Sequence, residues 1–340
     1  MLKFQENVPL APLTTLKVGG PARFFVMATS VDDVIATVEF ARERGLNLFF
    51  LGGGSNILVS DKGFDGLVVK IGLKGLAERG HLITAQAGED WDQFVAGCVE
   101  NGLAGVECLS GIPGSVGGTP VQNVGAYGQE VSETIVSVEC LDLRGLEVVE
   151  LSNEACGFSY RTSIFNTTMR DRYVVLSVTF CLEPGGPAKI VYKDLLDHFN
   201  GKQATLSDVR QAVLSIRRSK SMVIDPTDPN SKSAGSFFKN PVVSGEKLKQ
   251  IEESVGNGIV PHFPFGEMVK IPAAWLIERA GFHKGFVLGN VGLSSNHTLA
   301  LINRGGATAG EILGLKEVIV DEVVSKFGIE LEPEPIFIGS

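Results

Sequence analysis

This sequence lacks the features that mark membrane proteins and nucleic-acid-binding proteins. No stretch approaches the roughly 18 consecutive apolar residues of a membrane span, and the opening MLKFQENVPLAPLT has neither the basic end nor the apolar centre of a signal peptide. We therefore expect a cytoplasmic protein that binds no membrane. The 30 Lys and Arg residues are outnumbered by 39 Asp and Glu, and the formal net charge of −9 disfavours nucleic acid as a partner. Any anionic ligand must be met by local cations.

Cysteine and histidine are few and scattered. The cysteines have no C-x-x-C pair and no zinc-like spacing, so we expect buried, reduced packing residues at Cys98, Cys108, Cys140, Cys156 and Cys181. The histidines form no pattern either, and stand at His81, His198, His262, His283 and His297. The sequence therefore predicts no metal site.

Glycine, by contrast, is plentiful, and one cluster stands in LGGGSNILVSD, residues 51–61. Three consecutive glycines permit positive φ and let another group approach the backbone, as at a phosphate. The segment is not a P-loop, because no Lys-Ser/Thr pair follows, and it is not the dinucleotide fingerprint, because Ile57 stands where the third glycine belongs. A linker or an ordinary turn remains the alternative.

A second cluster, GIPGSVGGTPVQNVGAYG at residues 111–128, is too apolar for a linker. A buried glycine-rich loop must satisfy its backbone N–H groups, and a pyrophosphate or the edge of a flat heterocycle accepts several at once. We therefore expect the two loops, about 60 residues apart in the sequence, to converge on one extended cofactor.

Hydrophobic periodicity predicts a mixed α and β chain of two or three domains, which 340 residues with 44% hydrophobic content can support. Helices are predicted at 31–45, 89–102, 205–220, 246–256, 272–281 and 309–328. Strands are predicted at 22–28, 47–51, 56–61, 66–72, 81–88, 173–182, 285–290, 297–303 and 331–340, with a hairpin over 134–151 that turns at Arg144-Gly145. The loop 221–235 is either a domain boundary or an ordinary connection.

Three further segments place polar groups where packing does not demand them. FSYRTSIF carries Tyr160 and Arg161, SAGSFFKNP carries Ser236 before two phenylalanines, and LEPEP carries Glu332 and Glu334 at alternate positions, on one face if the segment is extended. Taken singly, each has a plain structural explanation: a turn arginine, a capping serine and a solvated edge.

Together, these segments resemble one family from about residue 10 to the end. TTLKVGGPARFFV, LGGGSNILVSD, GIPGSVGGTPVQNVGAYGQEV, FSYRTSIF, SAGSFFKNP, PAAWLIERAGFHKGF, SNHTLALIN and LEPEPIFIG occur in the order typical of the UDP-N-acetylenolpyruvoylglucosamine reductases. The resemblance implies a cytoplasmic, monomeric flavoenzyme of peptidoglycan precursor synthesis. It implies noncovalent FAD, NADPH as co-substrate, and a small UDP-sugar carrying an enolpyruvyl ether as substrate.

The resemblance also implies an α+β architecture. The FAD-binding part would have two subdomains of the vanillyl-alcohol-oxidase/PCMH type, at 1–72 and 73–217, with FAD between them. An α+β substrate-binding domain would follow at 218–333, and a C-terminal strand at 334–340 would return near the first subdomain.

Site residues follow from the motif positions. The resemblance implies that the FAD pyrophosphate is held by Gly52, Gly53, Gly54, Ser55, Asn56, Gly111, Gly114, Ser115, Gly117, Gly118, Asn123, Gly125 and Ala126. It implies that the UDP-sugar is bound by Tyr160, Tyr192, Lys220 and Asn240. It makes Ser236 the proton donor, with Arg161 and Glu334 polarising the enolpyruvyl carboxylate. Many relatives have Val-Arg after the catalytic glutamate, where this chain has Pro335-Ile336, so the choice of Glu334 over Glu332 depends on the surrounding PE and FIG residues. The interval between Lys220 and Ser236 is longer than in some relatives, which affects the match of Lys220.

The chemistry is consistent with these residue types. Hydride addition to the methylene end of the enol ether pushes charge onto the α-carbon and the carboxylate, which must be stabilised and then protonated. Arg161 offers a planar fork for a carboxylate. Glu334, if kept protonated by burial, donates a hydrogen bond to the developing charge, and the Ser236 hydroxyl suffices as acid for a strongly basic carbon.

Two other functions remain open at this point. A flavin-dependent oxidase of the same fold class often links flavin through a histidine or cysteine near the first glycine loop, but residues 1–80 contain neither. A nucleotide-binding or flavin-storing protein without turnover is opposed only by the coincidence of Arg161, Ser236 and Glu334.

Overall fold

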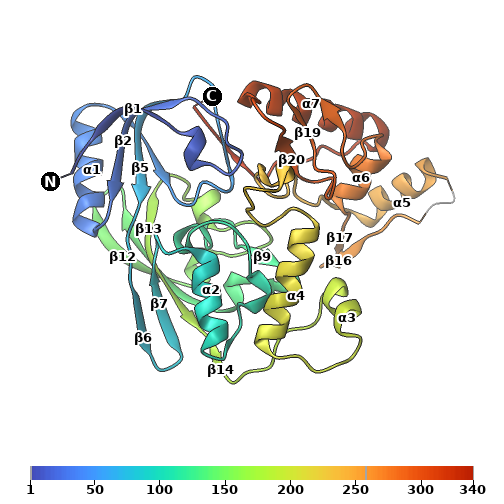
Figure 1. The fold of residues 1–340 in the computed structure, drawn as a ribbon, viewed down its shortest axis with the longest axis horizontal. Helices are drawn as coiled ribbons and strands as arrows, with labels where there is room; N and C mark the ends of the chain where they lie inside the picture. Colours follow the sequence, from blue (N-terminus) through green and yellow to red (C-terminus); the bar gives the residue numbers. More distant parts are fainter. Residues whose placement is uncertain (1, 257–258, 340) are drawn as a thin grey trace. The chain divides into compact units, whose positions relative to one another are not determined.

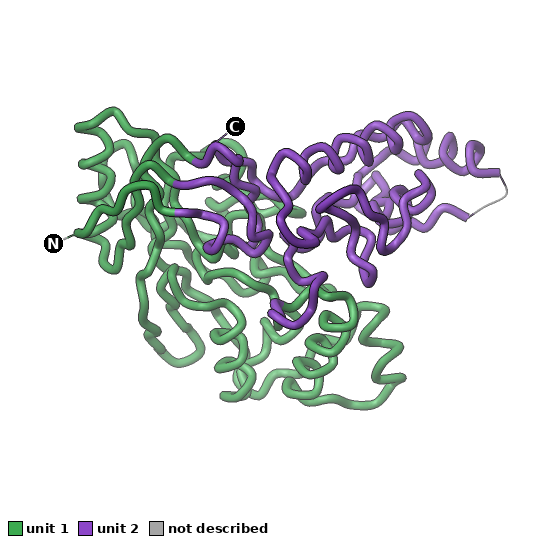
Figure 2. Tube along the Cα trace, turned by 45° about the horizontal axis from the view of Figure 1, so that its top comes forward, with its two compact units in different colours: residues 1–8, 22–54, 64–223 green, residues 9–21, 55–63, 224–340 purple. Residues whose placement is uncertain are grey.

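The computed structural model describes residues 2–256 and 259–339. The chain divides into two compact units, each assembled from several segments (Figure 2). Unit 1 comprises Met1–Val8, Ala22–Gly54 and Phe64–Val223. Unit 2 comprises Pro9–Pro21, Ser55–Gly63 and Ile224–Ser340. The division of the flavin-binding part into subdomains at 1–72 and 73–217, and the domain bounds predicted beyond it, stay predictions.

The first sheet is partly parallel. Its strands lie in the order β1 (Gln5–Pro9), β2 (Pro21–Ala28), β5 (Phe64–Ile71) and β3 (Asn47–Leu51). Both β2 and β3 pair parallel with β5, so β5 is central and carries the continuous apolar run expected of a strand buried on both faces. Helix α1 (Val31–Glu43) connects β2 to β3 and begins at Ser30, whose side chain accepts a hydrogen bond from the Asp33 N–H.

The second sheet of unit 1 is antiparallel throughout (Figure 1). Its strands lie in the order β12 (Glu147–Ser152), β11 (Ile135–Asp142), β13 (Tyr173–Cys181), β7 (Leu82–Gln86) and β6 (Leu76–Arg79). The pairing of β11 with β12 confirms the hairpin predicted over 134–151. Helix α2 (Trp91–Glu100) packs on this sheet through Trp91 and Phe94, whose rings lie 6.0 and 4.9 Å from that of Phe180.

Two helices and two short strand pairs complete unit 1. They are α3 (Lys193–Phe199), α4 (Leu206–Ser219), β8 (Leu103–Ala104) with β14 (Glu183–Pro184), and β9 (Gly125–Ala126) with β10 (Gln129–Glu130). A small core joins α3 and α4 to the 3-10 turn at Glu107–Leu109 through Cys108, Leu195, Val209, Ala212 and Val213. This core fixes α3, the helix that directly follows Tyr192.

Unit 2 is built around its longest helix, α7 (Ala309–Phe327). The other helices are α5 (Gly245–Ser254) and α6 (Ala273–Arg279). The strands form three small sheets: β15 (Val242–Val243), β17 (Met268–Lys270) and β16 (Phe263–Phe265); β18 (Val287–Leu288), β19 (Val291–Leu293) and β20 (Leu301–Asn303); and β21 (Ile336–Ile338) parallel to β4 (Ile57–Val59). Ile312, Leu315, Ile319 and Val323 are fully buried at helical spacing along α7.

Several sequence expectations need correction. Cys181 is exposed, because β13 ends there and its last side chain points outward, whereas the other four cysteines are buried. The strand predicted from His297 begins only at Leu301, and the closing strand begins at Ile336. Strands β1 and β6 had no strong apolar signal because their residues are mostly exposed.

No helix within 2–256 and 259–339 has the length and apolar character needed to cross a bilayer. In the same residues, no group of three or more His, Cys, Asp or Glu side chains could hold a metal ion.

The start of α7 generates a test of how unit 2 is held together. Asp61, just beyond β4, accepts hydrogen bonds from Ala309 N at 2.7 Å and Gly310 N at 2.9 Å, and Thr308 Oγ1 accepts one from Glu311 N. Asp61→Ala should lower the free energy of unfolding by about 0.5–2 kcal/mol, the cost of losing a helix cap. Thermal denaturation measures the change. Asp65→Ala is the matched control, since Asp65 forms an exposed ion pair with Arg23 and caps no helix in the described residues, and equal loss in both variants would contradict the capping role.

Candidate functional site

The two glycine loops of unit 1 lie in direct backbone contact. A Cβ atom built on Gly53 would stand 2.4 Å from the Cα of Gly114, and one built on Gly52 would stand 2.8 Å from Ser115 Oγ. The first distance is too short for any side chain, so glycine is required at Gly53 by its neighbour. The structure therefore confirms the predicted meeting of the loops.

The junction also presents unpaired backbone donors. Within residues 2–256 and 259–339, no protein oxygen accepts a hydrogen bond from the backbone N–H groups of Gly53, Gly54, Gly114 and Ser115. The segment beyond them differs, because the N–H of Gly117 donates to Ala87 O at 2.9 Å. Backbone N–H groups converging from two loops suit an anionic oxygen cluster such as a pyrophosphate.

Lys70 adds a positive charge beside the first loop. It is the one charged residue in the apolar run of β5, and its Nζ donates to the carbonyl of Gly52. Burial, with a contribution from Lys74, lowers the pKa of Lys70. Lys70 was not among the predicted site residues, although a lysine inside the apolar run GLVVKIG is a signal for a buried cation.

The second loop is anchored at its start by a carboxylate. Asp92 Oδ1 accepts the Gly111 N–H at 2.6 Å, and the two carboxylate oxygens of Asp92 bind Arg210 at 2.6 and 3.0 Å. Burial pushes the pKa of Asp92 upward, but the bonds from Arg210 and Gly111 outweigh it and the pKa is lowered overall. The loop is thus held by a bidentate ion pair between α2 and α4.

Arg217 is a second cation that the sequence did not single out. It lies buried near the end of α4, where its Nη2 donates to Met222 O at 2.7 Å. In the described part of the chain its Nε has no hydrogen-bond partner. Burial lowers the pKa of Arg217, while Tyr127 and Asp92 act in the opposite direction. An anion bound close to this side chain would satisfy a buried donor at low cost.

Arg161 lies on a strained turn held against the second glycine segment. Its φ is +56°, in the left-handed region, and its Nη2 donates to Gly125 O at 2.7 Å. Asn166 Nδ2 donates back to Arg161 O at 3.1 Å, and the guanidinium carbon lies 5.2 Å from the centre of the Tyr160 ring. A non-glycine residue held in this conformation is typical of functional sites.

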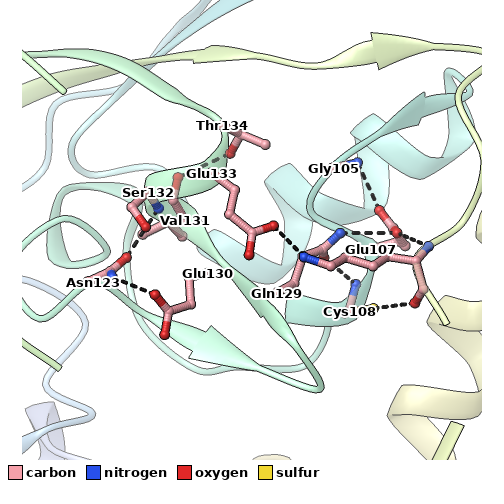
Figure 3. Close-up of polar contacts among 11 residues, drawn as sticks. Gly105, Glu107, Cys108, Asn123, Gln129, Glu130, Val131, Ser132, Glu133 and Thr134 are labelled. Carbon is pink, nitrogen blue, oxygen red and sulfur yellow. Dashed lines mark hydrogen bonds and ion pairs between the residues drawn. The ribbon is translucent and has the colours of Figure 1, made fainter. Parts of the chain in front are cut away.

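Asn123, predicted to contact the cofactor, has protein partners for its side chain. Its Nδ2 donates to Glu130 Oε2 at 2.8 Å and its Oδ1 accepts the Ser132 N–H (Figure 3). The same nitrogen donates to Ser159 O at 3.1 Å. The side chain therefore stabilises the turn that carries Arg161. Contact between Asn123 and a cofactor stays a prediction.

Tyr192 and Lys220 are brought together with Tyr127. The rings of Tyr127 and Tyr192 meet edge to face with centres 5.5 Å apart, and Lys220 Nζ lies 6.0 Å from the centre of the Tyr127 ring. Lys220 also pairs with Asp194 at 2.7 Å. Burial raises the pKa of Tyr127 to about 12, so its hydroxyl remains a donor at neutral pH. Tyr192 itself is 43% exposed, which leaves its ring open to a ligand.

In unit 2, an antiparallel backbone pairing places Glu334 beside Phe237, the residue that follows Ser236. Phe238 bridges to Pro333, and the Glu334 N–H donates to Phe237 O at 2.9 Å. Ser236 directly precedes Phe237, so two predicted catalytic residues stand on adjacent backbones. The hydroxyl of Ser236 makes no hydrogen bond within the part of the chain that the structure describes.

The two candidate glutamates have different surroundings. Glu332 has a side chain 68% exposed and forms an ion pair with Lys239 at 2.5 Å. Glu334 is only half-buried, and its carbonyl accepts a hydrogen bond from Asn56 Nδ2 at 3.2 Å. The Asn56 carbonyl in turn accepts the Ile336 N–H. Asn56 thus supports the Glu334 segment, a role that the sequence did not suggest.

The remaining predicted residues divide between the units. Asn240 Oδ1 accepts the Ala273 N–H at 2.9 Å and so caps α6. Unit 1 contains Gly52, Gly53, Gly54, the segment 111–126, Tyr160, Arg161, Tyr192 and Lys220. Unit 2 contains Ser55, Asn56, Ser236, Asn240 and Glu334. Ligand contacts of these residues stay predictions.

The chain is similar to known flavoproteins over nearly its whole length. An FAD-binding domain family matches residues 22–152, and the C-terminal domain family of UDP-N-acetylenolpyruvoylglucosamine reductase matches residues 226–338. Proteins of that name from Thermobifida fusca and Streptomyces coelicolor are 48% and 46% identical to this chain, covering 99% and 98% of it and 98% and 90% of their own lengths. The crystal structure of UDP-N-acetylenolpyruvylglucosamine reductase from Thermus caldophilus covers 99% of this chain with a TM-score of 0.69 at 24% identity. The predicted α+β flavoprotein fold is confirmed.

The loop junction fits the pyrophosphate of FAD on two grounds. The backbones of Gly53 and Gly114 approach so closely that a Cβ would fill the space, and the N–H groups beside them have no protein acceptor within 2–256 and 259–339. Lys70 supplies local positive charge in a protein of net charge −9.

A single methyl group therefore tests the flavin site. Gly53→Ala should leave the protein folded but with much reduced flavin, because the new Cβ forces the loops apart. The ratio of flavin to protein absorbance measures occupancy, and circular dichroism checks the fold. Gly97→Ala is the control, since a Cβ on Gly97 meets nothing within 4 Å in the described structure. Full occupancy in Gly53→Ala would remove the junction from the flavin site.

Proposed function

The chain belongs to the UDP-N-acetylenolpyruvoylglucosamine reductase family, and on that premise we propose that it reduces the enolpyruvyl ether of UDP-N-acetylglucosamine to UDP-N-acetylmuramate with electrons from NADPH. The observation that carries this proposal is the backbone pairing in unit 2 that places Glu334 beside Phe237, the residue that follows Ser236, because it brings the segments with the hydroxyl donor and the carboxyl group together. Arg161 is the third group of this proposal, on the strength of its motif position. The enzyme acts as a monomer in the cytoplasm.

Cofactor binding falls to the loop junction. The N–H groups of Gly53, Gly54, Gly114 and Ser115 hold the FAD pyrophosphate, with Lys70 beside them. The chemistry supplied by FAD when bound is the transfer of reducing equivalents from NADPH to the enolpyruvyl double bond. The remaining work of stabilising charge and delivering a proton is done by side chains of this chain.

Hydride addition to the methylene carbon leaves negative charge on the α-carbon and the carboxylate of the substrate. Arg161 binds this carboxylate through its planar guanidinium, and its hydrogen bond to Gly125 O fixes the plane before substrate arrives. Glu334 donates a hydrogen bond to the developing charge in its protonated form. Ser236 gives its hydroxyl proton to the α-carbon, and a water or a lysine restores that proton.

The UDP group is bound by local cations and aromatic rings, since the net charge of −9 repels it at long range. Lys220 is held at Tyr127 by its pair with Asp194, and Tyr192 stands against the same ring. Tyr160 and Asn240 complete the substrate contacts. The oxygen of the Asn240 side chain caps α6, so the amide nitrogen is the group that we assign to substrate.

Substrate binding can be tested at Lys220. Lys220→Ala and Tyr192→Phe should raise the KM for the UDP-sugar by about tenfold, as expected from losing a charge-assisted hydrogen bond, and leave flavin reduction by NADPH less affected. Steady-state and stopped-flow kinetics measure the two effects. Lys326→Ala removes an equal charge from α7 and should leave the KM unchanged. Unchanged values in both site variants would exclude these residues from the UDP site.

The role of Ser236 can be tested by separating the half-reactions. Ser236→Ala should keep NADPH reduction of the flavin near normal, while reoxidation by the enolpyruvyl sugar slows by roughly 10²–10⁴-fold, the usual cost of losing a general acid. Ser236→Cys should recover part of the rate, because a thiol also donates a proton.

Stopped-flow absorbance under anaerobic conditions follows both steps. Equal slowing of both half-reactions, or an unaffected oxidative half, would show that Ser236 is not the acid. A flavin-storing protein would reduce with NADPH and fail to reoxidise with the sugar in the unsubstituted form as well.

A further inference from the structure

The hairpin formed by β9 and β10, residues 125–130, makes polar contacts on two sides. Gly125 and Ala126 pair antiparallel with Glu130 and Gln129. The turn between them has φ values of +50° at Tyr127 and +83° at Gly128, as in the two-residue turns that suit hairpins. Successive side chains of a strand point to opposite faces, and Figure 3 shows Glu130 directed toward Asn123 and Gln129 toward Glu107.

One side of the hairpin holds the turn that carries Arg161. Glu130 Oε2 accepts from Asn123 Nδ2 at 2.8 Å, and the same nitrogen donates to Ser159 O at 3.1 Å. Ser159 closes the turn by pairing with Thr162 across Arg161. On the opposite strand of the hairpin, Gly125 O accepts the guanidinium of Arg161. The orientation of Arg161 is therefore set at its backbone through Glu130 and at its tip through Gly125.

The other side holds the segment that leads to Tyr192. Gln129 Nε2 donates to Glu107 Oε1 at 3.1 Å, and Gln129 Oε1 accepts the Cys108 N–H at 2.8 Å. Glu107 is fully buried and also accepts the N–H groups of Gly105 and Lys189 at 2.9 Å each. In each of these contacts the partner donates and Glu107 accepts. A carboxylate suits this position because all of its polar atoms are acceptors.

Lys189 is fixed at three points. Its N–H donates to Glu107, its carbonyl accepts from Cys108 Sγ, and its Nζ pairs with Glu133 at 2.6 Å. Residues 185–191 have no helix or strand of their own, and Tyr192 follows Lys189 by three positions. Beyond Tyr192, the pair of Asp194 with Lys220 provides the next tie. The buried carboxylate of Glu107 thus anchors the segment that leads to Tyr192.

We propose that Glu130 and Glu107 are positioning residues of the reaction, and that the β9–β10 hairpin sets the geometry of Arg161 through one and of Tyr192 through the other. This inference rests on the proposed function, since it requires Arg161 to bind the substrate carboxylate and Tyr192 to bind the UDP group. Neither glutamate touches substrate. Their effects on kinetics must therefore pass through the residues they hold.

The first test compares single variants of the flavin-loaded enzyme. Glu130→Ala should slow the limiting rate of flavin reoxidation by about tenfold or more, because misplacing a catalytic group costs up to about 100-fold, while Glu130→Gln keeps an oxygen for Asn123 and recovers the rate. Glu107→Gln places an amide N–H₂ group against the Gly105 N–H, so that two donors face each other. This variant should instead raise the half-saturation concentration of the UDP-sugar by about fivefold or more. Flavin reduction by NADPH should stay within about twofold of the parent enzyme in all three variants.

Double-mutant cycles then separate positioning from general destabilisation. Glu130→Ala should have little further effect in an Arg161→Ala background, and Glu107→Gln should have little further effect in a Tyr192→Ala background. The crossed pairs, Glu130 with Tyr192 and Glu107 with Arg161, are the matched controls and should be additive. If Glu107→Gln does not fold, Gln129→Met replaces it, since that change keeps the backbone contacts of Glu107.

The outcomes distinguish this inference from the proposed function. Slow or weakly binding single variants whose effects are additive in all four pairs would overturn the positioning roles alone. Parent-like kinetics in Glu130→Ala and Glu107→Gln would overturn them as well. If Arg161→Ala and Tyr192→Ala themselves leave flavin reoxidation unchanged, the site assignment of the proposed function fails, and the positioning roles fail with it.

Discussion

The contact between the backbones of Gly53 and Gly114 is the constraint on which the proposed flavin site depends. A Cβ on Gly53 would stand 2.4 Å from the Cα of Gly114, so the loops after β3 and after α2 can meet only without side chains. Their meeting places N–H groups from distant parts of the chain at one point. The loss of chain entropy at these glycines is offset by the rest of unit 1, whose core of Trp91, Phe94 and Phe180 fixes the elements on which the second loop is mounted.

An acidic protein that binds an anionic ligand must concentrate its positive charge. Lys70, Arg217 and Lys220 each lie beside a glycine segment or Tyr127, and each is held by a protein partner: the Gly52 carbonyl, the Met222 carbonyl and the Asp194 carboxylate. Partial burial strengthens the field of these charges because less water screens them. The net charge of −9 then affects only long-range encounter, which salt screens within about 10 Å.

The sequence predicted the elements with strong periodicity and missed those set by distant partners. Helices α1, α2, α4 and α7 and the β11–β12 hairpin carry caps, apolar stripes or turn residues within their own segments, so local chemistry sufficed.

The misses have physical causes too. Strands β1 and β6 are mostly exposed, and their pairing depends on neighbours rather than on an apolar pattern. Glu107 could not be recognised, because nothing in GVECLS shows that its carboxylate will meet the N–H of Lys189, 82 residues later. The same holds for Asn123: an asparagine in a glycine-rich segment suggested a ligand contact, whereas its partners include Ser159 O, 36 residues later.

The alternation of glutamate and proline in LEPEP explains how the ladder in unit 2 fixes its register. The Glu334 N–H donates to Phe237 O, and Glu332 O accepts the Lys239 N–H. A slip by one residue would place Pro333 or Pro335 where a donor is required, and proline has no N–H. The ion pair of Glu332 with Lys239 opposes the same slip from the side chains. Both prolines therefore exclude the registers that lie one residue away, and the register that the structure adopts places Glu334 beside Phe237, the residue that follows Ser236.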